Sequence, residues 1–204
     1  EIQAAAGNTI LADLSHLSLV AVTGEDTQVF LQSQLSNDIN LVNERQGQLS
    51  AYCNPKGRIL ALFRIFKHNN QFVISLPAAL QASIFQRLRL YVMRAKVNFE
   101  LMDDRLAAMG VAGQTASEQL AAALGSVPET VNASYSHAGM TVIRIADSPP
   151  RFEIIGNPQL LITLWKTLLK NAVAVSKMAW NWHHILSCIP CITAETSEQF
   201  IPQM

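Results

Sequence analysis

LSAYCNPKGRILALFRIFK, residues 49–67, is the stretch from which the rest of the fold is worked out. Over residues 60–67 the side chains alternate in a run of strand formers. A polar turn at 68–71 follows, and residues 72–76 form a second run of strand formers. The pattern therefore predicts a β-hairpin.

A turn with two cations leads into this hairpin. Residues 54–58 read Asn-Pro-Lys-Gly-Arg, in which Asn and Pro favour a turn and Gly57 can adopt a positive φ. Lys56 and Arg58 are therefore placed together at the entry of a strand. Such a turn either meets an anionic ligand at the mouth of a pocket or is an ordinary solvated turn, and the sequence leaves both interpretations open.

Composition limits the class of protein. The 204 residues are 50% hydrophobic, and 15 basic side chains balance 15 acidic ones, which disfavours a protein that coats nucleic acid. No run of about 18 apolar residues predicts a membrane-spanning helix. The opening EIQAAAGNTI does not resemble a signal peptide, and three cysteines favour a reducing compartment over a disulfide framework. A cytoplasmic location is expected.

The order of predicted elements indicates an α+β fold. Residues 1–103 are expected to form a first antiparallel-sheet-plus-helix subdomain, and residues 104–204 a second, related one, with the tail 178–204 running back toward the first. The predicted strands are 17–22, 60–67, 72–76, 96–102, 106–111, 140–145 and 152–155, and the predicted helices are 25–36, 117–124 and those that begin near Pro77 and Pro158.

The tail contains the one cluster of soft metal ligands in the sequence: His183, His184, Cys188 and Cys191. Cys188 and Cys191 form a CxxC pair, a spacing that suits a zinc site or a redox dithiol. The alternative is that these cysteines are simply packed or exposed, and a lone CxxC decides little. A zinc- or thiol-dependent interaction module is therefore one hypothesis for function, although no metal site is predicted.

Two other candidate groups have plain structural alternatives. Cys53 lies beside the cationic turn, but a nucleophilic cysteine would need a partner that the fold brings to it. Asp103 and Asp104 are paired carboxylates that fit either acid–base chemistry or a solvated turn. No phosphate-binding glycine loop, HExxH or GxSxG motif is present in the sequence.

Three segments together resemble a known family. They are DLSHLSLVAVTGEDTQVFLQSQLSNDI at 13–39, YCNPKGRILALFRIF at 52–66 and IPCITAETSEQFIPQ at 189–203. In this order and spacing they are similar to the YgfZ-like folate-binding proteins, which are relatives of the glycine cleavage aminomethyltransferase (T-protein). The resemblance runs over almost the whole chain.

The resemblance implies a ring of α+β subdomains around a site for tetrahydrofolate or a related folate. It also implies a role in maintaining iron–sulfur enzymes, including tRNA-modifying ones, with iron–sulfur enzymes or cluster-assembly proteins as partners and no direct contact with nucleic acid or membrane. A catalytic role is the less favoured alternative, as a folate-dependent aminomethyl or one-carbon transferase. The cofactor-binding candidates are Asn37, Asp38, Lys56, Gly57, Arg58, Phe66 and Gln203.

The chain departs from the family pattern at three points. A third, C-terminal barrel-like subdomain that carries a KGC motif is expected from the resemblance and is missing from this sequence, through truncation, proteolysis or natural loss. Leu186 stands where the family has an acidic residue that suits a pterin, and Cys188 stands where it has glycine. A transferase would also need an acid near Ser75, where this sequence has none.

Overall fold

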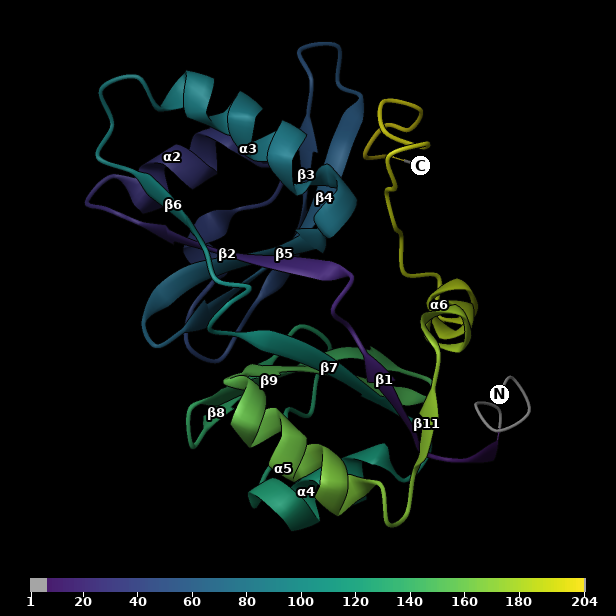
Figure 1. Ribbon diagram of the computed structural model, residues 1–204. Helices are drawn as coiled ribbons and strands as arrows, with labels where there is room; N and C mark the ends of the chain where they lie inside the picture. The colour runs from purple at the N-terminus through teal and green to yellow at the C-terminus, as the bar shows by residue number, and fades with distance from the viewer. Residues whose placement is uncertain (1–6, 204) are drawn as a thin grey trace. The chain divides into compact units, whose positions relative to one another are not determined.

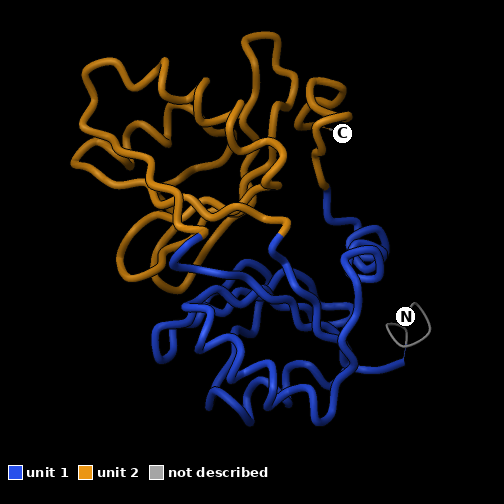
Figure 2. Tube along the Cα trace, in the orientation of Figure 1, with its two compact units in different colours: residues 1–15, 104–190 blue, residues 16–103, 191–204 orange. Residues whose placement is uncertain are grey.

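The computed structural model describes residues 7–203. The chain folds into two compact units, each built on one sheet (Figure 2). Unit 1 contains the chain up to Ser15 and Asp104–Pro190, and unit 2 contains His16–Asp103 and Cys191–Met204. The α+β class predicted from the sequence is confirmed.

Unit 2 is a five-stranded antiparallel sheet with strand order β3-β4-β5-β2-β6 (Figure 1). Helices cover one of its faces. Its strands are β2 (Leu17–Thr23), β3 (Gln48–Cys53), β4 (Ile59–His68), β5 (Gln71–Pro77) and β6 (Asn98–Leu101), and its helices are α2 (Thr27–Gln34), the 3-10 turn η1 (Ile39–Leu41) and α3 (Ala78–Val92).

The predicted hairpin is the centre of this sheet. Strands β4 and β5 pair in antiparallel register, with His68 opposite Gln71. Asn69 and Asn70 form the turn, with φ of 48° and 63°. Two successive positive φ angles match the twist of the flanking strands, and asparagine tolerates this conformation better than most residues.

The core of unit 2 lies between the sheet and its helices. Phe99 of β6 receives Phe30 of α2 and Phe85 of α3 edge-on, at centroid distances of 5.9 and 5.2 Å. Val29 of the same helix α2 faces away from this core and is 75% exposed. Asp26 precedes α2 without capping it through its side chain, and its carboxylate accepts the Lys96 backbone N–H at 2.7 Å.

Unit 1 is a six-stranded sheet with strand order β11-β1-β7-β10-β9-β8, antiparallel except for the β1–β11 pair. Helices α4 and α5 pack on one face, and α6 reaches the other. The elements are β1 (Ile10–Asp13), β7 (Ala107–Ala112), α4 (Ala116–Leu124), β8 (Ser134–His137), β9 (Met140–Asp147), β10 (Pro150–Gly156), α5 (Pro158–Leu168), β11 (Val173–Val175) and α6 (Lys177–Leu186).

The sequence was expected to divide at residue 103, and the two compact units depart from that division at both ends of the chain. Strand β1 pairs with β7 and β11, so its residues belong to the sheet of unit 1 and not with the segment that follows them. At the other end, α6 remains in unit 1, whereas Cys191–Met204 joins unit 2 and buries Ile192 in its core. Over residues 7–203, no helix is long and apolar enough to cross a membrane.

Candidate functional site

The cationic turn is held closed by Asn54. Its Oδ1 accepts the backbone N–H groups of Lys56 and Arg58 at 2.9 and 3.0 Å, and its own N–H donates to the Arg58 carbonyl at 2.8 Å. Gly57 has a φ of 74°, a conformation that costs glycine little. The turn that the sequence predicted is therefore a well-bonded loop between β3 and β4.

The C-terminal segment of unit 2 runs along this turn. The Arg58 guanidinium donates to the Gln199 carbonyl at 3.3 Å. Ile59 and Phe200 are joined by a backbone hydrogen bond of 2.9 Å, which continues the contact at the start of β4. Arg58 thus binds the chain itself, whereas the exposed Lys56 forms no ion pair within residues 7–203.

Asn37 and Asp38 serve the local backbone. The Asn37 side-chain amide donates to the Leu49 carbonyl at 2.7 Å. Asp38 caps η1, since its Oδ1 accepts the backbone N–H of Asn40 at 3.0 Å and the side-chain amide of the same residue at 2.8 Å. Both side chains have an adequate structural role without a ligand.

Phe66 lies elsewhere on the sheet. It is fully buried, on the face of β4 opposite the helices, and Arg64 and His68 share that face two residues to either side. Phe66 is seven residues beyond Ile59, which corresponds to about 23 Å along a strand. The structure therefore brings Lys56, Gly57 and Arg58 together with the tail that contains the exposed Gln203, and it holds Phe66 apart from them.

The Arg64–His68 face is polar although it is buried. Arg64 is 7% exposed and His68 is 5% exposed, and Ser75 of β5 stands opposite Arg64 in register. Burial lowers the pKa of His68 below its ordinary value, and the nearby Glu44 opposes that shift. Sequence reasoning missed Arg64 and His68, although polar residues at alternate positions of an apolar strand were the available signal.

Unit 1 contains a second buried polar group, which sequence reasoning also missed. The Arg151 guanidinium lies 4.0 Å from the centre of the Trp180 ring and donates to the Trp180 carbonyl at 3.3 Å. Glu153, the next residue on the same face of β10, is 5% exposed and stands opposite Gly110 of β7. The RFEI pattern looks like an ordinary half-exposed strand because a sequence does not show that α6 reaches this face.

The soft-ligand cluster of the tail is not a metal centre in the part of the chain that is described. Within residues 7–203, no three His, Cys, Asp or Glu side chains are arranged to hold a metal ion. His183 is 2% exposed inside unit 1, Cys188 is exposed after the end of α6, and Cys191 belongs to unit 2.

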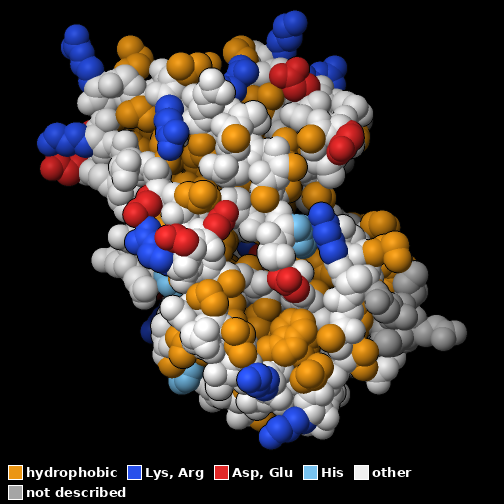
Figure 3. Space-filling model, in the orientation of Figure 1, with side chains coloured by type: hydrophobic (Ala, Val, Ile, Leu, Met, Phe, Trp, Pro, Cys, Tyr) orange, Lys and Arg blue, Asp and Glu red, His pale blue; other side chains and the backbone are white. Residues whose placement is uncertain are grey.

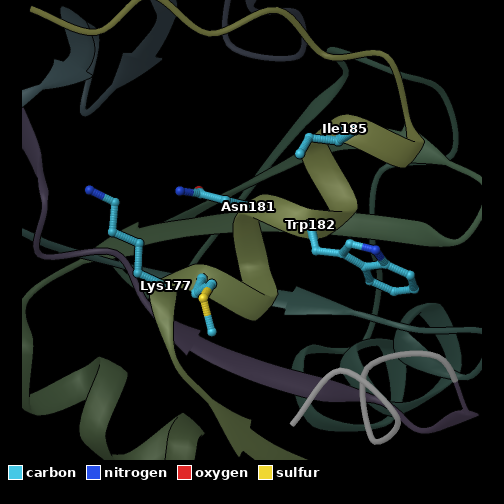
Figure 4. Close-up of a pocket in the computed structure, with 5 residues that line it drawn as sticks. Lys177, Asn181, Trp182 and Ile185 are labelled. Carbon is cyan, nitrogen blue, oxygen red and sulfur yellow. The ribbon is translucent and has the colours of Figure 1, made fainter.

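The outer face of α6 is apolar. Lys177, Met178, Asn181, Trp182 and Ile185 line a shallow hollow there, and Figure 4 shows them on successive turns of the helix. Met178 is 70% exposed and Ile185 is 75% exposed.

Asp103 and Cys53, the other candidates for catalysis, are accounted for by local structure. Asp103 accepts the Leu19 backbone N–H at 2.8 Å and the Ser18 hydroxyl at 2.9 Å, so it fixes β2 and is not half of a catalytic pair. Burial raises the pKa of the Cys53 thiol, which opposes a nucleophilic role.

Comparison with known proteins identifies the family to which this fold belongs. The GCVT N-terminal domain profile matches residues 1–175, and the chain belongs to that family. A solved structure of the glycine cleavage system aminomethyltransferase T from Bartonella henselae superposes with a TM-score of 0.72 over 83% of this chain and 48% of its own, at 20% identity. That likeness shows the fold.

Among curated relatives the chain is similar to proteins named tRNA-modifying protein YgfZ. The protein from Colwellia psychrerythraea is 24% identical over 196 residues, which is 96% of this chain and 60% of the relative. The protein from Photorhabdus laumondii is 28% identical over 193 residues, covering 95% and 58%. The chain thus spans about 60% of the length of these relatives.

Proposed function

We propose that this chain is the folate-binding part of a YgfZ-like protein of the cytoplasm. Through iron–sulfur enzymes or cluster-assembly proteins as partners, it would support iron–sulfur cluster maintenance and hence tRNA modification. The fold and the YgfZ relatives support membership of a folate-binding, tRNA-modifying family. Binding of a folate and the iron–sulfur role are what we propose beyond that membership.

The observation that carries the proposal is the buried face around Phe66 in unit 2. Arg64 and His68 lie two residues to either side of Phe66 on this face of β4, and all three side chains are buried. A pterin is flat and rich in hydrogen-bonding groups, so an aromatic side chain flanked by polar ones suits it chemically. The proposal therefore has the pterin of tetrahydrofolate bind against this face.

The cationic turn fits the other end of the ligand. A folate ends in carboxylates, and Lys56 offers an exposed ammonium group with no ion pair within residues 7–203. Because about 23 Å separates Phe66 from Ile59 along β4, only an extended ligand lying along this strand would reach both. The proposal gives Lys56 the carboxylate tail, with Gly57 allowing close approach at the turn.

The test is calorimetric titration with tetrahydrofolate. Lys56→Glu is expected to weaken binding about tenfold or more, since one attractive charge contact becomes repulsive. Lys170→Glu is the matched control, because Lys170 is an exposed lysine in the turn after α5, and it is expected to leave binding unchanged.

A second variant separates the two ends of the proposed ligand. Phe66→Leu is expected to weaken binding while thermal unfolding shows that unit 2 remains folded. Unchanged binding in Lys56→Glu would exclude the turn and keep the Phe66 face. Absence of tetrahydrofolate binding by the unmodified protein would exclude the proposed function.

A further inference from the structure

A second cleft lies in unit 1, between α5 and the strand ends of the six-stranded sheet. It has a volume of about 340 Å³, within the range of small-molecule sites. Ala107, Ala108 and Met109 of β7 line it on the sheet side, and Leu161 and Trp165 of α5 form its apolar wall. Figure 3 shows apolar side chains gathered over α5 on this side of the unit.

The sheet presents small residues at one point of this corner, next to Met109, which also lines the cleft. Ala107 stands opposite Gly156 in register, so neighbouring strands present a methyl group and a hydrogen atom there. The N-terminus of α5 follows at once, where Asn157 caps the helix by accepting the Gln159 backbone N–H at 2.9 Å. Strand and helix are thus fixed close together, and Met140 takes the space over Gly156, since its Cγ would lie 2.8 Å from a Cβ atom built there.

Opposite charges stand at the rim. Asp13 at the end of β1 and Lys166 in the last turn of α5 both line the cleft. The Asp13 carboxylate accepts the Ser15 N–H at 2.8 Å and the Ser15 hydroxyl at 3.1 Å, which leaves acceptor sites on both oxygens. Across residues 7–203, neither Asp13 nor Lys166 takes part in an ion pair.

We propose that this cleft binds a small zwitterion with an apolar body, such as a hydrophobic amino acid. The apolar body lies between the side chains of β7 that line the cleft and the indole of Trp165. The ammonium group pairs with Asp13, and the carboxylate pairs with Lys166. An apolar ligand would leave both rim charges unused, whereas a ligand with a single charge would satisfy only one.

The affinity expected for such a ligand is modest. A molecule the size of phenylalanine has about 12 non-hydrogen atoms, and at the efficiency typical of larger ligands it binds with a Kd of about 1 mM. This range suits titration monitored by ¹H–¹⁵N spectra, in which the indole N–H of Trp165 reports on the cleft directly.

The test uses three related probes on the full chain. Phenylalanine carries both charges, phenethylamine only the ammonium group, and 3-phenylpropionate only the carboxylate. Phenylalanine is expected to shift the Trp165 indole signal and to bind about tenfold more tightly than either of the others.

Two variants assign the charges, and a third closes the cleft. Asp13→Asn is expected to weaken phenylalanine and phenethylamine about tenfold and to leave 3-phenylpropionate unchanged. Lys166→Gln is expected to weaken binding of phenylalanine and 3-phenylpropionate about tenfold and to leave binding of phenethylamine unchanged. Ala107→Leu fills the sheet side of the cleft and is expected to abolish binding of all three probes while the spectrum remains that of a folded protein.

Three outcomes would overturn the proposal. They are no shift of the Trp165 signal at a few millimolar phenylalanine, equal affinity for the three probes, and affinities that Asp13→Asn and Lys166→Gln leave unchanged. Because the cleft lies on unit 1 and the folate proposal rests on unit 2, either can fail without the other.

Discussion

Gly110→Ala is expected to dislodge the indole that holds α6 on the sheet of unit 1. A Cβ atom at residue 110 would lie 2.5, 2.7 and 2.8 Å from three ring atoms of Trp180. Ordinary carbon contacts are about 3.5 Å or more, so the ring must move by about 1 Å. Trp180 is 1% exposed and carries the Arg151 guanidinium on its face, so little free space is available for that movement.

The loss of stability caused by Gly110→Ala lies between two limiting cases for the Trp180 ring. If the ring shifts within its site, the cost is that of overpacking, about 1–3 kcal/mol. If the ring leaves its site, the loss approaches that of removing a buried tryptophan, about 3–5 kcal/mol. A destabilisation of about 3 kcal/mol is therefore expected for Gly110→Ala.

Denaturant unfolding followed by tryptophan fluorescence measures this effect selectively. All three tryptophans of the chain, Trp165, Trp180 and Trp182, lie in unit 1, so the signal reports the unfolding of that unit. The midpoint is expected to fall without a large change in the denaturant slope.

A double-mutant cycle isolates the proposed cause. Leucine at residue 180 ends short of the ring atoms that clash, so Gly110→Ala should cost at least about 1 kcal/mol less in a Trp180→Leu background. The reasoning is refuted if Gly110→Ala changes stability by less than about 0.5 kcal/mol, or if its cost is the same in both backgrounds.

Three further perturbations test other parts of the chain. Asn54→Ala removes the acceptor of two backbone N–H groups in the cationic turn and is expected to cost about 1–2 kcal/mol, measured by thermal unfolding. His68 has a lowered native pKa, so the unfolded chain binds more protons just below neutral pH. Stability should then fall as pH drops through about 6.5, less steeply in His68→Gln. Burial raises the pKa of the Cys53 thiol, so iodoacetamide at about pH 8 should alkylate the exposed Cys188 first, and faster labelling of Cys53 would contradict this.

Much of the fold could be predicted from local patterns. The hairpin of residues 60–67 and 72–76 and the helices that follow Pro77 and Pro158 appear in the structure as β4, β5, α3 and α5. These elements are long or have strong periodicity, and turn residues or a proline mark their ends. Strands β8 and β11 were not predicted, because runs of four and three residues carry too little pattern.

The place of β1 in the fold could not be predicted because its partners are remote. Ile10 pairs with Ala112 and Val173, and no local feature of residues 10–13 specifies either one. Its apolar residues indicate a strand-like segment and nothing about which sheet it joins. Pairings of this kind depend on the whole tertiary structure and not on propensity.

The candidate site was predictable only where a turn forms it. Asn-Pro-Lys-Gly-Arg fixes the positions of Lys56 and Arg58 through local hydrogen bonds, and these are visible in the sequence. Arg64 and Glu153 look like surface residues of half-buried strands, and only the fold shows that they are buried. The sequence of a strand that contains a charged residue thus does not show which face of the sheet other elements will bury.

The position of β1 between β11 and β7 has a consequence for biosynthesis. Residue 10 leaves the ribosome 163 residues before its partner Val173, since 173 − 10 = 163. At about 5–20 residues per second this delay is roughly 8–33 s. Until then the edge of β1 that faces β11 remains unmatched even after β7 has been made, so the nascent protein is expected to depend on a chaperone that shields this edge until β11 arrives.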